Sequence, residues 1–121
     1  MGARTDARPG LGRAGEDAAL RVYLGRGFGL LARNWRCSIG ELDLVLALDG
    51  LIVFCEVKTR SGSAFGGGYE AVTRTKRHKL RALAEAYLID HVPPPARVRF
   101  DVASVWVGPS RTDVEIFQDA F

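Results

Sequence analysis

Apolar residues recur along the chain with two different periods, which separate predicted helices from predicted strands. A helix is predicted over about 13–24, because the residues three, four, seven and eight positions after Glu16 are all apolar. The same spacing of leucine, alanine and tyrosine predicts a second helix over about 75–90, which the prolines at 93–95 end. Each predicted helix therefore has one face to bury against another element.

Five other segments are typical of β-strands, namely 28–36, 41–48, 51–59, 98–107 and 113–117. Asp49-Gly50 is a strong signal for a two-residue hairpin between the second and the third of them. The third strand is dense in apolar residues and is expected at the centre of the sheet. The order helix, three strands, helix, two strands predicts an α/β or α+β domain in which helices pack on one sheet.

Length and composition restrict the chain to one globular class. It has 121 residues, of which 47% are apolar and 26% charged, enough for one domain with its own core. Residues 1–11 show no periodicity and are expected to form a flexible tail. No apolar run reaches the roughly 20 residues that span a bilayer, and the two cysteines lack the spacing of a zinc site. A cytoplasmic protein without a membrane partner is expected.

Positive charge is concentrated in the middle of the chain. The net charge is only +3, but residues 58–81 carry seven basic side chains against one acidic side chain, Glu70. Such a segment attracts a phosphate-bearing partner such as a nucleic acid, although a solvated helix face has the same composition. The residues expected to contact nucleic acid are Arg60, Arg74, Lys76, Arg77 and Lys79.

The two strands joined by the predicted hairpin carry charged residues at one end. The first strand alternates acidic residues, Glu41 and Asp43, against three leucines on the other face. The second strand ends in Glu56 and Lys58, which a period of two places on one face with the apolar residues before them. The hairpin sets the strand of Asp43 beside that of Glu56 and Lys58.

Helical phase adds one charged residue from each predicted helix. Glu16 falls on the apolar stripe of the first helix and faces the sheet, whereas Asp17 lies toward the edge of that stripe. Lys76 lies four residues before Leu80, in line with the buried face of the second helix. Each charged residue alone has an ordinary explanation, such as an exposed ion pair, a helix dipole or a snorkelling side chain. Their convergence weakens those explanations.

Asp43 and Glu56 are candidate ligands of Mg²⁺ or Mn²⁺. Magnesium takes hard oxygen ligands, usually one or two protein carboxylates with waters and substrate phosphate, and the carbonyl of Val57 could add a third protein ligand. Such an ion polarises a phosphodiester and lowers the pKa of a bound water. Lys58 could orient that water and stabilise negative charge on the phosphoryl oxygens.

The blocks GELDLV at 40–45 and VFCEVKTR at 53–60 resemble the YraN family of small bacterial proteins, within the PD-(D/E)xK nuclease superfamily. The resemblance extends from Gly15 to about Val105 and includes the blocks at 15–19, 33–36 and 99–102. It implies a restriction-endonuclease-like α/β fold over 12–121, with a mixed central sheet flanked by helices. It also implies a nuclease-type site formed by Glu16, Asp43, Glu56 and Lys58. Lys76 and Asp101 resemble family positions near that site, and Glu41 is a further candidate beside it.

The function implied by the resemblance is metal-dependent hydrolysis of phosphodiester bonds in DNA. The family also resembles archaeal Holliday-junction resolvases, so branched or junction DNA is one expected substrate. Symmetric cleavage of a junction needs two active sites and hence a homodimer. Two alternatives remain open at this point: a non-catalytic nucleic-acid-binding module, and a scaffold that recruits partners to a DNA-processing complex.

Overall fold

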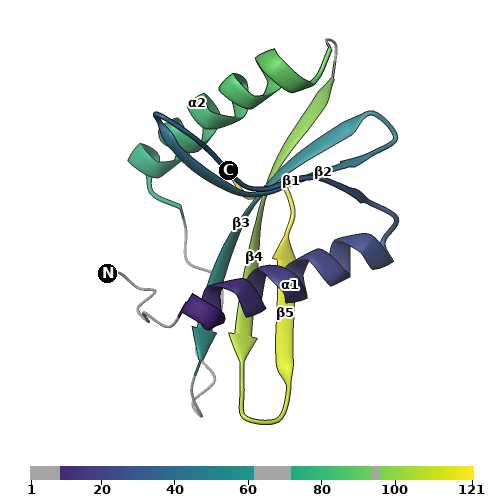
Figure 1. Cartoon of the computed structure of the whole chain (residues 1–121), viewed down its shortest axis with the longest axis vertical. Coiled ribbons are helices and arrows are strands. Elements are labelled where there is room, and N and C mark those ends of the chain that lie inside the picture. Colours follow the sequence, from purple (N-terminus) through teal and green to yellow (C-terminus); the bar gives the residue numbers. More distant parts are fainter. Residues whose placement is uncertain (1–8, 62–71, 94–95) are drawn as a thin grey trace.

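Two helices and five strands form the part of the chain that the structure describes, residues 9–61, 72–93 and 96–121 of a computed structural model (Figure 1). In chain order they are α1 (Pro9–Gly25), β1 (Gly29–Cys37), β2 (Gly40–Leu48), β3 (Leu51–Ser61), α2 (Arg74–His91), β4 (Arg97–Val107) and β5 (Thr112–Phe117). None of the described helices is long and apolar enough to cross a membrane.

The five strands make one sheet in the order β1-β2-β3-β4-β5. Strands β3 and β4 run parallel, and every other neighbouring pair is antiparallel. The parallel pair requires a crossover connection, and α2 lies within it. The predicted α/β fold, a mixed central sheet flanked by helices, is confirmed, and β3 lies at its centre as expected.

The helices cover opposite faces of the sheet, so the core has two halves. On one face α1 packs through Ala19 and Tyr23 onto Val53 of β3 and Val105 of β4. On the other face Leu83 and Tyr87 of α2 pack onto a second apolar cluster that includes Phe54 and Phe100. Figure 1 shows α1 crossing β3, β4 and β5, while α2 lies at the other end of the sheet. The residues of β3 therefore contribute to both halves of the core.

The first helix begins earlier than the sequence pattern predicts. It starts at Pro9, so residues 9–11, expected to belong to a flexible tail, are helical, while residues 1–8 lie outside the described part. The reason is that proline is favoured at the first helical position, where its missing N–H has no intrahelical partner to lose. Strand β3 also continues to Ser61, two residues further than predicted.

The alternation predicted for β2 is wrong at Leu42. Leu44 and Leu46 pack on the α1 face, whereas Leu42 packs with α2 on the opposite face. On either side of Asp43, Arg33 pairs with Leu44 and Trp35 with Leu42 in the same register, and the register shift of the β1–β2 ladder lies further along, between Leu30 and Ala32. Asn34 has a left-handed φ of 55°, which no regular strand contains. The change of face at Leu42 therefore occurs beside Asn34, where β1 departs from regular strand geometry.

Candidate active site

Gly15 sets how closely α1 approaches the sheet. Gly15 is buried, and a Cβ at this position would overlap the side chain of Thr59 on β3, even Thr59 Cβ lying only 2.9 Å away. The glycine therefore lets the helix backbone lie directly against the end of β3. The next residue, Glu16, is consequently carried inward: its side chain is 16% exposed, against 44% for Asp17. The predicted orientations of these two carboxylates are confirmed.

One oxygen of Glu16 is held by two neighbouring residues of β1. Arg33 Nε donates to Glu16 Oε1 at 3.2 Å, and Asn34 Nδ2 donates to the same oxygen at 3.0 Å. Arg33 also pairs with Asp17 at 2.8 Å. Partial burial lowers the pKa of Arg33, but the hydrogen bonds and charges of Asp17 and Glu16 outweigh it and raise that pKa overall. This cluster holds α1 against β1 and fixes the Glu16 carboxylate.

Asp43 belongs to β2, and its side chain reaches β3. Among the described residues, one group donates a hydrogen bond to it. Its Oδ2 accepts the backbone N–H of Val57 at 2.8 Å. Burial and the charge of Glu56 raise the pKa of Asp43 to about 7; the Val57 hydrogen bond opposes this, and the charges of Glu16 and Glu41 add to it. A carboxyl that titrates near neutrality beside other carboxylates is characteristic of functional sites, although structural clusters produce such shifts as well.

Glu56 lies on β3, near Asp43 of the adjacent strand β2, and it faces α2. Its side chain is 11% exposed, and its Oε2 lies 2.5 Å from Lys76 Nζ. Lys76 is 44% exposed and reaches inward from the first turns of α2. Lys76 was expected to contact nucleic acid; the structure places its ammonium on a site carboxylate instead. The prediction that Lys76 shares the phase of the buried helix face agrees with this placement.

Lys58 lies two residues beyond Glu56 on β3 and is half-buried. The alternation of the strand places it on the same face as Glu56. It makes no hydrogen bond or ion pair with the described parts of the chain. In this respect Lys58 differs from Lys76, whose ammonium contacts Glu56.

The donor set at this position suits magnesium or manganese. Among the described residues, no three His, Cys, Asp or Glu side chains are grouped to hold an ion by themselves. Asp43 and Glu56 nevertheless offer two adjacent carboxylates, and Val57, whose N–H binds Asp43, places its backbone beside them. Two carboxylates with a carbonyl and waters are sufficient for Mg²⁺. The negative charge of Glu56 helps to raise the pKa of Asp43, and a divalent cation would neutralise this charge.

Asp101 and Glu41, the two residues expected beside the site, have different surroundings. Asp101 is fully buried on the α1 face and accepts hydrogen bonds from Tyr23 Oη at 2.7 Å, from the Arg99 guanidinium at 2.9 Å and from the Asp119 N–H at 3.0 Å. It is thus a saturated structural carboxylate. Glu41 pairs with Arg36 at 3.6 Å and acts on the site only through its charge.

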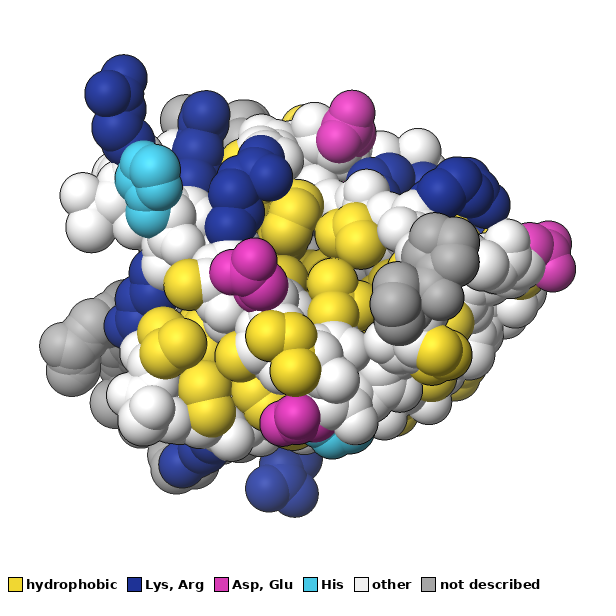
Figure 2. Space-filling model, turned by 90° about the horizontal axis from the view of Figure 1, so that it is seen from above, with side chains coloured by type: hydrophobic (Ala, Val, Ile, Leu, Met, Phe, Trp, Pro, Cys, Tyr) yellow, Lys and Arg dark blue, Asp and Glu magenta, His cyan; other side chains and the backbone are white. Residues whose placement is uncertain are grey.

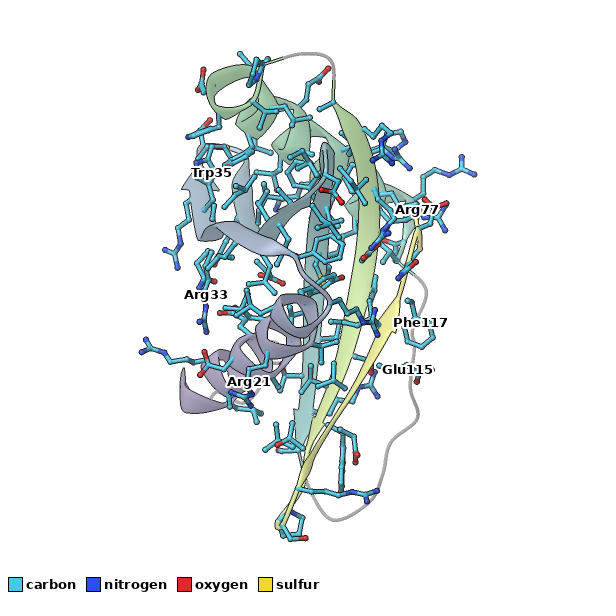
Figure 3. The ribbon with its side chains drawn as sticks, turned by 90° about the vertical axis from the view of Figure 1, so that its right-hand side faces the viewer. Arg21, Arg33, Trp35, Arg77, Glu115 and Phe117 are labelled. Carbon is cyan, nitrogen blue, oxygen red and sulfur yellow. The ribbon has the colours of Figure 1, made fainter. Side chains whose placement is uncertain are left out.

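Four of the five residues expected to bind nucleic acid lie on the exposed surface of α2. Figure 2 shows lysine and arginine side chains gathered with a histidine at one end of the face seen from above, beside a band of hydrophobic side chains. Lys79 lies against Gly40 at the β1–β2 turn, and Arg77 donates to the Val72 carbonyl at 3.1 Å. In Figure 3, Arg77 and Arg33 lie on opposite sides of the molecule. The exposed basic residues of this helix are Arg74, Lys76, Arg77, Lys79 and Arg81, while Arg60 is half-buried on β3.

Arg33 and Asn34 have no role predicted from the sequence, although both contact Glu16. The block at 33–36 contributes to the family resemblance, but a strand pattern gives no reason for adjacent residues to reach one carboxylate. An asparagine within a predicted strand is a weak signal, because asparagine tolerates left-handed backbone better than other residues with a Cβ.

The fold and the site define a small α/β protein in which Asp43 of β2 lies within reach of the charges of carboxylates on α1 and β3. The family model described as "Uncharacterised protein family UPF0102" matches residues 15–105, and the chain belongs to this family. A UPF0102 protein of Frankia alni is 49% identical over 118 residues, covering 95% of this chain and 97% of the relative. UPF0102 proteins of Parafrankia sp. (51% over 96 residues, 79% and 81% covered) and Mycolicibacterium smegmatis (47% over 118 residues, 96% and 94%) are also similar.

Proposed function

We propose that this protein is a metal-dependent nuclease of the PD-(D/E)xK type that hydrolyses phosphodiester bonds in DNA. One observation carries the proposal: Asp43 of β2 lies within reach of the charges of Glu56 on β3 and Glu16 on α1, and burial together with these charges raises the pKa of Asp43 to about 7. A protein that bound phosphate by charge alone would gain nothing from three carboxylates at its site. A divalent cation explains why they are gathered.

The residues of the site divide into those that hold an ion and those that act on the substrate. Asp43, Glu56 and the Val57 carbonyl would hold Mg²⁺ or Mn²⁺, which supplies a polarised phosphate and a more acidic water. Lys58, on the face of Glu56, would orient the attacking water and stabilise charge on the phosphoryl oxygens. Glu16 supplies a third negative group that can accept a proton or a hydrogen bond from water.

The exposed basic residues of α2 would carry the nucleic acid. Arg74, Arg77 and Lys79 lie on the helix that also sends Lys76 to Glu56, so DNA bound along α2 would pass close to the carboxylates. Phosphate contacts of this kind give affinity without sequence preference. Branched DNA is the substrate we favour, and a homodimer would supply the second site that a symmetric cut requires.

The proposal is tested with labelled linear, flapped, branched and four-way DNAs, and with RNA, incubated with magnesium or manganese. Wild type should cleave at least one DNA, and Lys58→Ala should abolish cleavage while binding that DNA with little loss of affinity, because Lys58 acts on water and transition-state charge. Arg111→Ala, which removes a basic residue far from α2, is the matched control and should cleave like wild type. A wild type that cuts nothing, together with weaker binding by Lys58→Ala, would identify a binding module instead.

A further inference from the structure

We infer that Asn34 is a positioning residue, which orients the Glu16 carboxylate through its side-chain amide and its left-handed backbone. The inference rests on the proposed function and deepens it, because it assigns to the site a residue outside the four expected ones. Its basis is that Arg33 and Asn34, consecutive residues of β1, both donate to Glu16 Oε1.

Consecutive side chains of a regular strand project to opposite faces of the sheet. Arg33 and Asn34 could not reach one oxygen atom from such a strand. The φ of 55° at Asn34 removes the alternation, and both side chains reach the same side. The partners of Arg33 and Trp35 on β2, Leu44 and Leu42, flank Asp43. The left-handed residue Asn34 therefore brings both donors to Glu16 at the level of the ladder where Asp43 lies.

Two donors on Oε1 fix the rotation of the Glu16 carboxyl group. Oε2 accepts no hydrogen bond from the described residues, so it is the oxygen left for water or a ligand. The charge of Glu16 already acts on Asp43, so a carboxylate held in this orientation belongs to the same electrostatic unit. An amide is the suitable group at position 34, because a carboxylate would repel Glu16 and an aliphatic side chain would donate nothing.

The amide of Asn34 is not needed to attach α1. The helix is fixed by the packing of Ala18, Ala19 and Tyr23, and the ion pair between Arg33 and Asp17 remains when Asn34 changes. Asn34→Gly keeps the left-handed backbone, which glycine adopts readily, and removes the amide alone. This substitution therefore separates the orientation of Glu16 from the stability of the fold.

The test compares the full-length wild type with Asn34→Gly and with Asp49→Gly, a matched control. Asp49 is also a non-glycine residue with a left-handed φ, 49°, but lies in the β2–β3 turn. Manganese affinity is measured by electron paramagnetic resonance, cleavage on the substrate found above, and stability by thermal melting. We expect Asn34→Gly to lower manganese affinity or cleavage by about 10-fold to 100-fold, as loss of an outer-shell partner does, with a melting temperature like that of the control. Asn34→Asp should lose at least as much.

The outcomes separate this inference from the proposed function. If wild type binds manganese and cleaves, and Asn34→Gly matches it in both, the positioning role is overturned while the nuclease proposal stands. If Asn34→Gly loses stability in proportion to its loss of affinity, or if Asn34→Asp behaves like wild type, the role is also overturned. If wild type binds no manganese, and Asp43→Ala changes neither cleavage nor the response of the melting temperature to manganese, both proposals fail together.

Discussion

Two carboxylates of the sheet, on the strands either side of β3, have opposite surroundings. Asp101 of β4 is fully buried and accepts hydrogen bonds from Tyr23, from both arms of the Arg99 guanidinium and from a backbone N–H. Asp43 of β2 accepts one backbone N–H and is surrounded by the negative charges of Glu56 and Glu16. The two residues have the same chemistry, but only Asp101 has the donors that a buried charge requires.

The difference shows where this fold is built for stability and where it is not. A saturated carboxylate such as Asp101 ties α1, β4 and the chain after β5 together, and it has no capacity left for a ligand. An unsaturated one such as Asp43 weakens the protein at neutral pH and is retained only where another role requires it. The predictions below test this contrast by changing one carboxylate environment at a time.

The largest expected effect is that of Asp101→Asn on stability. The amide cannot accept from all of Asp101's donors, and the partly buried Arg99 is left without its counter-ion. We expect unfolding by urea to show a loss of about 3–5 kcal/mol, the usual cost of breaking a buried ion pair. Asp113→Asn is the control, because Asp113 pairs with Arg111 on the surface, where about 0–1 kcal/mol is expected. Equal losses of stability in Asp101→Asn and Asp113→Asn would show that the buried carboxylate matters no more than one in a surface ion pair.

Asp43→Asn is expected to increase the stability of the protein at neutral pH, whereas Asp101→Asn decreases it. The folded pKa of Asp43 is about 7, above the value of about 3.9 in an unfolded chain, so the folded state binds more protons between these pH values. Stability of the wild type therefore falls as pH rises from about 4 to about 7. The Asn variant keeps an acceptor for the Val57 N–H and loses the titration. Its advantage over wild type should be absent near pH 4 and reach up to roughly 4 kcal/mol near pH 7, at about 1.4 kcal/mol per pKa unit.

Denaturation curves at several pH values measure this difference directly. Asp113→Asn again serves as control and should follow the pH dependence of wild type. A stability advantage of Asp43→Asn that is constant from pH 4 to pH 8 would contradict the raised pKa. If the metal site exists, magnesium should stabilise the wild type above about pH 7 and leave Asp43→Asn unchanged, because a ligand must be deprotonated.

Periodicity was sufficient to predict the helices, the strands and the inward direction of Glu16, because these follow from burying apolar faces. It was insufficient where a strand is irregular. Leu42 lies on the face opposite to the predicted one, close to Asn34, whose left-handed conformation strand alternation does not describe. The partners of Asp101 and Glu56 lie far from them in sequence, and only the fold brings them together. The nuclease activity, the metal and the nucleic acid are still predictions.

Gly15→Ala tests how the unsaturated site is positioned. The new methyl would overlap Thr59, so α1 must move away from β3 and carry Glu16 with it. We expect a loss of about 1–3 kcal/mol, typical of overpacking, together with a loss of manganese affinity. Gly10→Ala in the same helix has open space around it and should cause no loss. Thr59→Ala combined with Gly15→Ala should recover part of the stability; no recovery would mean that Thr59 is not the obstacle.

The smallest expected effect on stability is that of Lys76→Gln. This variant compares the cations that pair with the two carboxylates Glu56 and Asp101. Lys76 is 44% exposed, whereas Arg99 is 20% exposed and holds Asp101 with two hydrogen bonds. Solvent screening therefore limits the loss on removing Lys76 to about 0–1 kcal/mol. A divalent cation would compete with Lys76 for Glu56, so magnesium should raise the melting temperature of Lys76→Gln more than that of wild type. Lys79→Gln, one turn along α2, should respond to magnesium like wild type. A Lys76→Gln variant as unstable as Asp101→Asn, with no added response to magnesium, would make the Glu56 pair structural and end the contrast.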